Sequence, residues 1–217
     1  MAYLVKEIFL SLQGEGANCG RVAVFCRFSG CNLWSGNPDE KHLAICKFCD
    51  TDFVGIEGSG GGEYSTPEVL AAKVKSFWPE NGPTSDPGRY RPLVIVTGGE
   101  PLLQLDTKLL KQMHAAGFEV AVETNGTLSP PKGIDWITVS PKAGSELVIE
   151  SGNELKLVFP QKGAEPAKFV HLDFEYFFLQ PMDGPDLEIN TRLASSYCLK
   201  NPQWRMGIQM HKFLGIK

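Results

Sequence analysis

Residues 93–101, Leu-Val-Ile-Val-Thr-Gly-Gly-Glu-Pro, are the stretch of the sequence that decides the fold. Four apolar residues run into two glycines, a pattern typical of a buried strand that ends in a tight turn. A helical pattern follows over Leu102–Ala116 and stops at Gly117, a common C-terminal cap. The next apolar run, Val120–Glu123, predicts another strand. This strand–helix–strand order favours a parallel α/β architecture.

The rest of the chain continues this alternation. Four further apolar runs predict buried strands, at Val22–Phe28, Trp136–Val139, Leu155–Phe159 and Tyr176–Leu179. Two more helices are expected, one starting within Ser65–Glu68, where Ser or Thr precedes Pro, and one over Leu187–Lys200. Six strands and three main helices fall short of the eight units of a complete barrel. We therefore expect an incomplete, TIM-like barrel of about six parallel strands.

The sequence shows no linker that would divide it. Residues 1–217 are therefore expected to form a single domain, which is long enough to bury a sizeable core. Two stretches rich in Gly or Pro, residues 55–62 and 79–92, are expected to be flexible surface loops.

Composition excludes several classes of protein. The chain has 21 basic and 25 acidic residues and a formal net charge of −4, with no basic stripe, so nucleic acid is not an expected partner. No apolar run approaches the roughly 18 residues needed to cross a membrane. The N-terminus lacks the features of a signal peptide, so a cytoplasmic location is expected. In a reducing cytosol, the six cysteines are better explained by metal binding and buried thiols than by disulfides.

Three of the cysteines have the spacing of a metal site. Residues 46–49 read Cys-Lys-Phe-Cys, and Cys31 lies upstream, just after the predicted strand Val22–Phe28. Three thiolates can hold three irons of a cubane cluster and leave the fourth iron open to a small molecule. They are also compatible with zinc, because His42 is available to complete a Cys₃His site. The segment by itself leaves both interpretations open.

The Gly-Gly-Glu-Pro turn is expected at the same end of the sheet as the cysteines. Gly98 and Gly99 would let a ligand approach the backbone, where carbonyl groups helped by Glu100 would receive an amino group. The alternative is an ordinary strand-to-helix turn without a ligand. The coincidence of the turn with the cysteines favours a binding site.

The chain resembles the radical S-adenosylmethionine superfamily and, within it, the 7-carboxy-7-deazaguanine synthase family of the queuosine and deazapurine pathway. The motifs that carry the resemblance follow one another along the chain, at residues 7–16, 25–28, 46–51, 97–101, 123–126, 140–142, 180–183 and 209–212. One departure is the spacing of the first two cysteines. The superfamily pattern places three residues between them, whereas this chain has fourteen, Asn32–Ile45.

The resemblance implies three cofactors and assigns residues to them. A [4Fe-4S] cluster is expected on Cys31, Cys46 and Cys49, and Mg²⁺ on Thr51. S-adenosylmethionine is expected to contact two groups of residues, those beside the cysteines and the glycine turn (Phe48, Cys49, Asp50 and Gly99) and those at two later strand ends (Ser140, Pro141, Lys142, Gln180, Pro181, Met182 and Asp183). Substrate contacts are expected from Leu12, Gln13, Gly14, Arg27, Thr97 and the C-terminal carboxylate of Lys217.

The sequence itself also suggests a binding role for Arg27. It ends an otherwise apolar strand, where a charge is costly unless it is paired. A substrate carboxylate fits the guanidinium fork, and an internal salt bridge is the alternative.

The resemblance also implies the reaction. The expected enzyme is a carbon–nitrogen lyase that uses a radical to convert 6-carboxy-5,6,7,8-tetrahydropterin to 7-carboxy-7-deazaguanine with loss of ammonia, the cofactor rather than a side chain doing the difficult step. Its expected partners are the pterin substrate, an electron donor such as flavodoxin or ferredoxin, and a second copy in a homodimer. Two alternatives remain at this stage, a glycyl-radical-enzyme activase and a non-catalytic, zinc-stabilised binding module.

Overall fold

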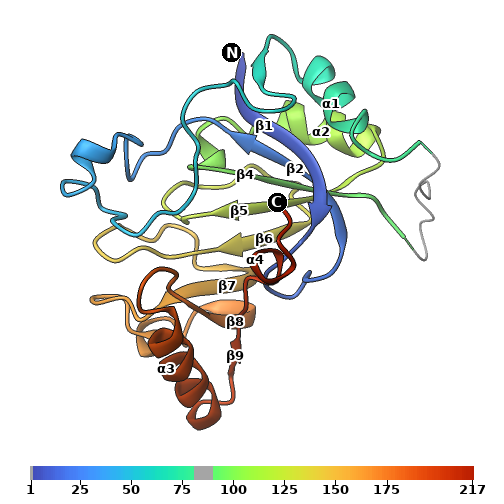
Figure 1. Cartoon of the computed structure of the whole chain (residues 1–217). Helices are drawn as coiled ribbons and strands as arrows, with labels where there is room; N and C mark the ends of the chain where they lie inside the picture. Colours follow the sequence, from blue (N-terminus) through green and yellow to red (C-terminus); the bar gives the residue numbers. More distant parts are fainter. Residues whose placement is uncertain (1, 81–89) are drawn as a thin grey trace.

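The computed structural model describes residues 2–80 and 90–217 and contains one mixed sheet of nine strands (Figure 1). The strands lie in the order β3-β1-β2-β4-β5-β6-β7-β8-β9. From β2 to β9 all neighbours are parallel, whereas β1 pairs antiparallel with β2 and β3. The strands are β1 Tyr3–Leu12, β2 Val22–Phe28, β3 Gly62–Tyr64, β4 Leu93–Gly98, β5 Glu119–Thr124, β6 Trp136–Val139, β7 Ser151–Phe159, β8 Asp173–Pro181 and β9 Trp204–Met206.

Each of the six predicted strands lies within an observed strand, one in β2 and one in each of β4 to β8. The α-helices are α1 Pro67–Lys75, α2 Thr107–Ala115, α3 Leu187–Lys200 and the short α4 Met210–Leu214. Short 3₁₀ turns occupy Pro38–Glu40, Pro101–Leu103 and Pro166–Lys168. The three predicted helices correspond to α1, α2 and α3.

The start of α2 differs from the prediction. A 3₁₀ turn at Pro101–Leu103 comes first, and α2 begins only at Thr107. The carboxylate of Asp106 accepts a hydrogen bond from Leu109 N (2.8 Å) and caps the helix. Because Asp at an N-cap satisfies free backbone N–H groups of the first turn, the helix starts there rather than at Leu102.

Alternation along the parallel strands gives the sheet two different faces. One face carries apolar residues throughout and is covered by α1, α2 and α3, whose buried residues include Leu70, Leu109 and Ala194 (Figure 1). The opposite face is apolar only in the first half of the strands, at residues such as Phe25 and Ile95. Toward the carboxyl ends of the strands this face carries polar side chains instead. The candidate site lies at that end of the sheet.

The glycine-rich stretch 55–62 lies at the surface as expected, but hydrogen bonds hold it against β1. Ser59 O accepts a hydrogen bond from Ile8 N (2.7 Å), and Gly58 N donates to Lys6 O (3.0 Å). A Cβ at Gly58 would lie 2.5 Å from Lys6 O, so glycine is needed for this close approach to β1. The second predicted loop, 79–92, falls largely on residues 81–89, which lie outside the described residues.

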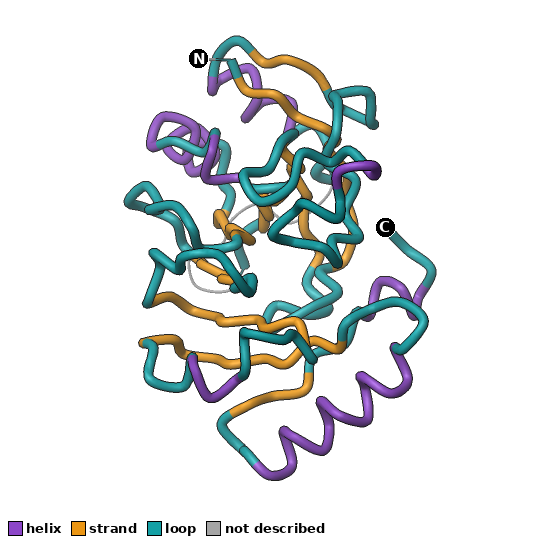
Figure 2. Tube along the Cα trace, turned by 90° about the vertical axis from the view of Figure 1, so that its left-hand side faces the viewer, coloured by secondary structure: helices purple, strands orange, loops and turns teal. Residues whose placement is uncertain are grey.

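The N-terminal strand β1 contains an irregularity that matters for the site. Its pairing with β2 shifts between Val5 and Glu7. Val5 thus packs in the core under the helices, whereas Glu7 lies directly opposite Arg27 on the polar face. Figure 2 shows the chain from the side, with the C-terminal segment after α3 running back along one side of the molecule and ending at about mid-height. No helix among the described residues is long and apolar enough to cross a membrane.

Candidate active site

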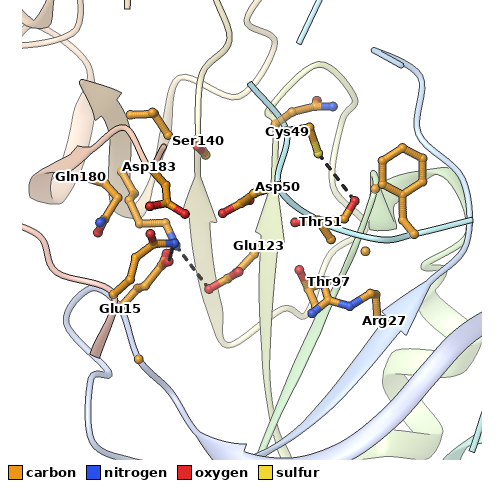
Figure 3. Close-up of a pocket in the computed structure, with 18 of the residues that line it drawn as sticks. Glu15, Arg27, Cys49, Asp50, Thr51, Thr97, Glu123, Ser140, Gln180 and Asp183 are labelled. Carbon is orange, nitrogen blue, oxygen red and sulfur yellow. Dashed lines mark hydrogen bonds and ion pairs between the residues drawn. The ribbon is translucent and has the colours of Figure 1, made fainter. Parts of the chain in front are cut away.

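A cavity of about 410 Å³ opens at the carboxyl ends of the parallel strands, a size typical of small-molecule sites. All the cofactor and substrate residues that the resemblance assigns, except Pro141, line it. Pro141 is buried beside it, and its carbonyl accepts a hydrogen bond from Gln161 Nε2 (3.3 Å). In Figure 3, Cys49 and Thr51 lie across the cavity from Gln180. The structure therefore brings together residues that are as much as 205 positions apart (Leu12 to Lys217).

The three predicted cluster cysteines all line this cavity. Cys46 is buried, and Cys31 and Cys49 are partly buried. A hydrogen bond from the Cys46 thiol lowers the pKa of Cys49 to about 6. Burial raises the pKa of Cys31, whose sulfur accepts a hydrogen bond from Leu33 N (3.4 Å). A pocket with three thiols and no further cysteine among its described lining residues fits a cluster that keeps one iron open.

The Cys₃His zinc alternative is not favoured by this arrangement. His42 is exposed, does not line the cavity, and its Nδ1 lies 2.9 Å from Asp39 O. Within the described residues, no group of three His, Cys, Asp or Glu side chains is placed to hold a single metal ion. A cubane makes a weaker demand, because each cysteine binds a different iron and the sulfurs do not have to converge on one point.

The glycine turn after β4 supports the first cysteine directly. A Cβ at Gly99 would lie 2.3 Å from Gly30 O and 2.6 Å from Cys31 Cβ, so only glycine lets the two turns touch. Glu100 N donates to Gly30 O (3.0 Å) and joins them further.

The side chain of Glu100 corrects the expectation that it helps to bind an amino group. It is fully buried and does not line the cavity. Its carboxylate accepts hydrogen bonds from Leu102 N (2.9 Å), Thr124 Oγ1 (2.7 Å) and Asn125 N (2.8 Å). Burial raises the pKa of Glu100, and these hydrogen bonds oppose the shift. Glu100 therefore ties the end of β4 to the end of β5, a structural role.

Two later strand ends present polar groups to the cavity. After β6, Lys142 Nζ donates to Ser140 O (2.6 Å) and Ser140 Oγ (2.7 Å). Burial lowers the pKa of Lys142, and its electrostatic interaction with the neighbouring Cys46 and Cys49 opposes this. At the end of β8, Gln180 is 5% exposed, and its Oε1 is buried without a hydrogen-bond partner in the described residues. Because an unpaired buried acceptor is costly, this oxygen needs a donor that the described residues do not supply.

The predicted substrate residues gather at the other end of the cavity. Thr97 and Arg27 are neighbours across the β2–β4 pair. Arg27 Nε donates to Glu7 Oε1 (3.0 Å), so the internal salt bridge considered as an alternative is present. The same carboxylate also pairs with Lys217 Nζ, and the carbonyl of Lys217 accepts from Ser11 Oγ (2.6 Å). The C-terminal residue therefore returns to the cavity, as the resemblance implied.

Comparison with known proteins decides the family. No protein-family model matches the chain. The 7-carboxy-7-deazaguanine synthase of Caulobacter vibrioides is 58% identical over 216 residues, with 100% of both chains covered. That of Bordetella pertussis is 57% identical over 216 residues, also with 100% of both covered.

This chain belongs to the 7-carboxy-7-deazaguanine synthase family. Its fold is also similar to that in the crystal structure of QueE from Escherichia coli, with a TM-score of 0.66, 26% identity, and coverage of 97% of this chain and 95% of that chain. Members of the 7-carboxy-7-deazaguanine synthase family are radical S-adenosylmethionine lyases that use a [4Fe-4S] cluster, S-adenosylmethionine and Mg²⁺. Membership does not favour either the activase or the zinc-module alternative.

Sequence analysis missed one part of this pocket, the ion-pair network around Lys156. Lys156 of β7 is nearly buried, lines the cavity, and pairs with Glu15 and with Glu123 Oε1 (3.4 Å). Gln13 Nε2 donates to the same Glu123 oxygen (2.9 Å), and Gln209 Nε2 donates to Glu15 Oε1 (2.9 Å). Burial alone would raise the pKa of Glu15, but attraction to Lys156 together with hydrogen bonds from Lys156 and Gln209 lowers it. The pocket floor is thus a charged network in which two carboxylates share one lysine.

The C-terminal tail forms part of the pocket wall and was predicted only in part. Lys212 Nζ bridges Asp50 Oδ2 (2.8 Å), next to Cys49, and Asp183 Oδ2 (2.6 Å), after β8. Met210 N donates to Gly14 O (2.9 Å). A Cβ at Gly14 would lie 2.3 Å from His211 Nδ1, so Gly14 makes room for the tail. The predicted role of Gly14 in substrate binding therefore has a packing role beside it.

Proposed function

We propose that this chain converts 6-carboxy-5,6,7,8-tetrahydropterin to 7-carboxy-7-deazaguanine with loss of ammonia, in queuosine or deazapurine biosynthesis. One observation carries the proposal: the three cysteines and nearly all of the predicted cofactor and substrate residues line a single cavity. Full-length similarity to enzymes named for this product supports it.

The proposed cofactor residues surround one end of the cavity. Cys31, Cys46 and Cys49 would hold the [4Fe-4S] cluster and leave one iron for the methionine portion of S-adenosylmethionine. The rest of S-adenosylmethionine would be bound by Phe48, Asp50, Gly99, Ser140, Pro141, Lys142, Gln180, Pro181, Met182 and Asp183. The unpaired Gln180 Oε1 supports this part of the proposal, because an amino or hydroxyl group of the cofactor would satisfy it.

The proposed substrate residues are Leu12, Gln13, Gly14, Arg27, Thr97 and Lys217. Only the Nε of Arg27 is paired with Glu7 among the described residues, which leaves the outer N–H groups of the guanidinium for a substrate carboxylate. Thr51 would bind Mg²⁺, which commonly completes its coordination with water and substrate oxygens. Glu123 and Gln13 line the cavity beside these residues and would hydrogen-bond polar edges of a flat pterin.

The chemistry divides between cofactor and chain. Once bound by Cys31, Cys46 and Cys49 and reduced, the cluster would supply the electron that cleaves S-adenosylmethionine and starts the radical chemistry on the pterin. The chain orients the two small molecules. Arg27 and Thr97 fix the substrate at one end, Ser140 and Gln180 fix the cofactor at the other, and the tail that carries Lys212 excludes water between them.

We also propose the finer features implied by family membership. The mixed sheet is expected to be an incomplete, TIM-like barrel of about six parallel strands with three main helices, within a single domain of residues 1–217. The enzyme is expected to be cytoplasmic and homodimeric and to take its electron from a flavodoxin or ferredoxin.

The direct test is product formation. The chain, reconstituted anaerobically with iron and sulfide, is mixed with S-adenosylmethionine, Mg²⁺, a reductant and 6-carboxytetrahydropterin. We expect 7-carboxy-7-deazaguanine, 5′-deoxyadenosine and methionine, detected by mass spectrometry. Cleavage of S-adenosylmethionine with no deazaguanine product would overturn the proposed substrate, and no cleavage at all would overturn the proposed chemistry.

A further inference from the structure

The long segment between the first two cysteines, residues 32–45, has a folded structure of its own. Leu33 O accepts hydrogen bonds from Ile45 N (3.1 Å) and Cys46 N (3.5 Å), so the two ends of the segment meet. Asn37 caps the 3₁₀ turn Pro38–Glu40 through its side chain. Cys31 and Cys46 are therefore brought to the same cavity in spite of the fourteen residues between them.

The segment is also fastened to the chain that follows Cys49. The ring of Trp34 packs edge-on against Phe53, with the ring centroids 5.5 Å apart, and Phe53 is fully buried. Gly36 has a φ of +86°, and a Cβ there would lie 2.2 Å from Val54 Cγ2. Glycine is thus required both for the backbone conformation and for the close contact. Trp34 is thereby held in one place against the core.

Lys41 is the residue through which the segment reaches a cluster ligand. Its Nζ donates to Cys49 O (3.2 Å) and lies 5.2 Å from the centroid of the Trp34 ring. An ammonium over a tryptophan ring is attracted by the negative face of the ring, so Trp34 fixes its position. Among the described residues, Lys41 forms no ion pair with a carboxylate. Of the acidic side chains in this part of the chain, Glu40 accepts from Ser35 Oγ and Asp50 pairs with Lys212, and the carboxylate of Asp39 forms no ion pair with Lys41 among the described residues.

We propose that Lys41 is a positioning residue for the cluster: it holds the Cys49 peptide in place, and its unpaired positive charge stabilises the reduced cluster. The inference rests on the proposed function, because it requires a cluster on Cys31, Cys46 and Cys49. Reduction adds one negative charge to the cluster, and net charge near a cluster is one of the properties that set its reduction potential. The role of the fourteen-residue segment is then to place the ammonium group of Lys41 beside Cys49, the last of the three cluster ligands in the sequence.

The test compares three full-length variants, Lys41→Met, Lys41→Arg and Lys47→Met, after anaerobic reconstitution. Lys47 lies in the same loop, is exposed and makes no side-chain hydrogen bond or ion pair among the described residues, so it is the matched control. The first measurement is the reduction potential of the cluster, from a redox titration followed by electron paramagnetic resonance. The second is the rate at which a chelator removes iron.

We expect Lys41→Met to shift the potential to more negative values and to lose iron several-fold faster, while Lys41→Arg and Lys47→Met stay close to the parent protein. A potential unchanged by Lys41→Met, or changed as much by Lys47→Met, would overturn the inference and leave the proposed function intact. If Lys41→Met assembles no cluster, recovery of the cluster in Lys41→Arg supports the inference and its failure there contradicts it. A parent protein that binds no cluster would overturn both proposals.

Discussion

Lys156 sets the electrostatic balance of the pocket floor. It is the one lysine that pairs with both Glu15 and Glu123, and its side chain is only 8% exposed. Breaking a buried ion pair by removing one partner leaves an uncompensated buried charge. Lys156→Met should therefore lower the free energy of unfolding at pH 8 by about 3–5 kcal/mol, as measured by urea denaturation.

The same variant has a predicted pH dependence. In the parent protein the pKa of Glu15 is lowered, so its contribution to stability is present above the unfolded value of about 4.3 and is lost as the pH falls through the folded value. Without Lys156, burial would raise the pKa of Glu15 instead, so the cost should shrink between pH 8 and pH 5 as the carboxylate takes up a proton. Lys168→Met, which removes an exposed pair with Glu165, should leave the free energy of unfolding nearly unchanged at both pH values. A cost that is small, or constant across this pH range, contradicts the account.

For single residues, the sequence predicted well which of them line the cavity. It predicted less well what each residue contacts there. Lys156 was missed because the run Leu155–Phe159 was interpreted as an apolar buried strand, although alternation places Lys156 on the polar face with Val158. Gly14 and Gly99 were predicted as ligand contacts, and the structure gives each a packing reason in His211 and Gly30. A single sequence does not show which distant backbone a glycine touches.

The C-terminal tail is the element most open to test. Lys212 connects the cysteine loop, through Asp50, to the end of β8, through Asp183, and all three side chains are 38–51% exposed. Exposed ion pairs contribute about 0.2–1 kcal/mol each. Lys212→Met loses both pairs and should therefore raise KM for S-adenosylmethionine roughly two- to thirtyfold, with a smaller change in kcat.

Two comparisons make the tail prediction specific. Lys212→Arg should recover most of the affinity, because a guanidinium can still bridge the two carboxylates. Arg192→Met, which removes an exposed pair with Glu188 on α3, should leave KM unchanged. The account of the tail is wrong if Lys212→Met binds S-adenosylmethionine as tightly as the parent protein does.

The elements that escaped sequence analysis share a physical cause, which is a weak or interrupted local pattern. β1 carries Lys6 and Glu7 and a shift of register beside them, so its alternation is broken. β9, Trp204–Met206, has three residues and forms only because β8 offers an edge. The strands β2 and β4–β8 were predictable because burial under helices requires continuous apolar runs.

For the whole molecule, the sequence predicted that the site forms at the carboxyl ends of the parallel strands. Parallel strands place all their carboxyl ends together, so motifs after β2, β4, β6 and β8 converge without any knowledge of loop structure. The closure of the site was not predictable in the same way. It depends on contacts between opposite ends of the chain, such as Lys217 with Glu7, which no local pattern encodes.

The central claim is that three cysteines bind a cluster with one iron open to S-adenosylmethionine. Electron paramagnetic resonance of the reduced, reconstituted protein, recorded with and without S-adenosylmethionine, tests it most directly, with Cys46→Ala as the comparison. The account predicts a cubane signal in the parent protein that changes when S-adenosylmethionine is added, and loss of that signal in Cys46→Ala. A signal that S-adenosylmethionine leaves unchanged, or a cluster that survives in Cys46→Ala, would contradict the account.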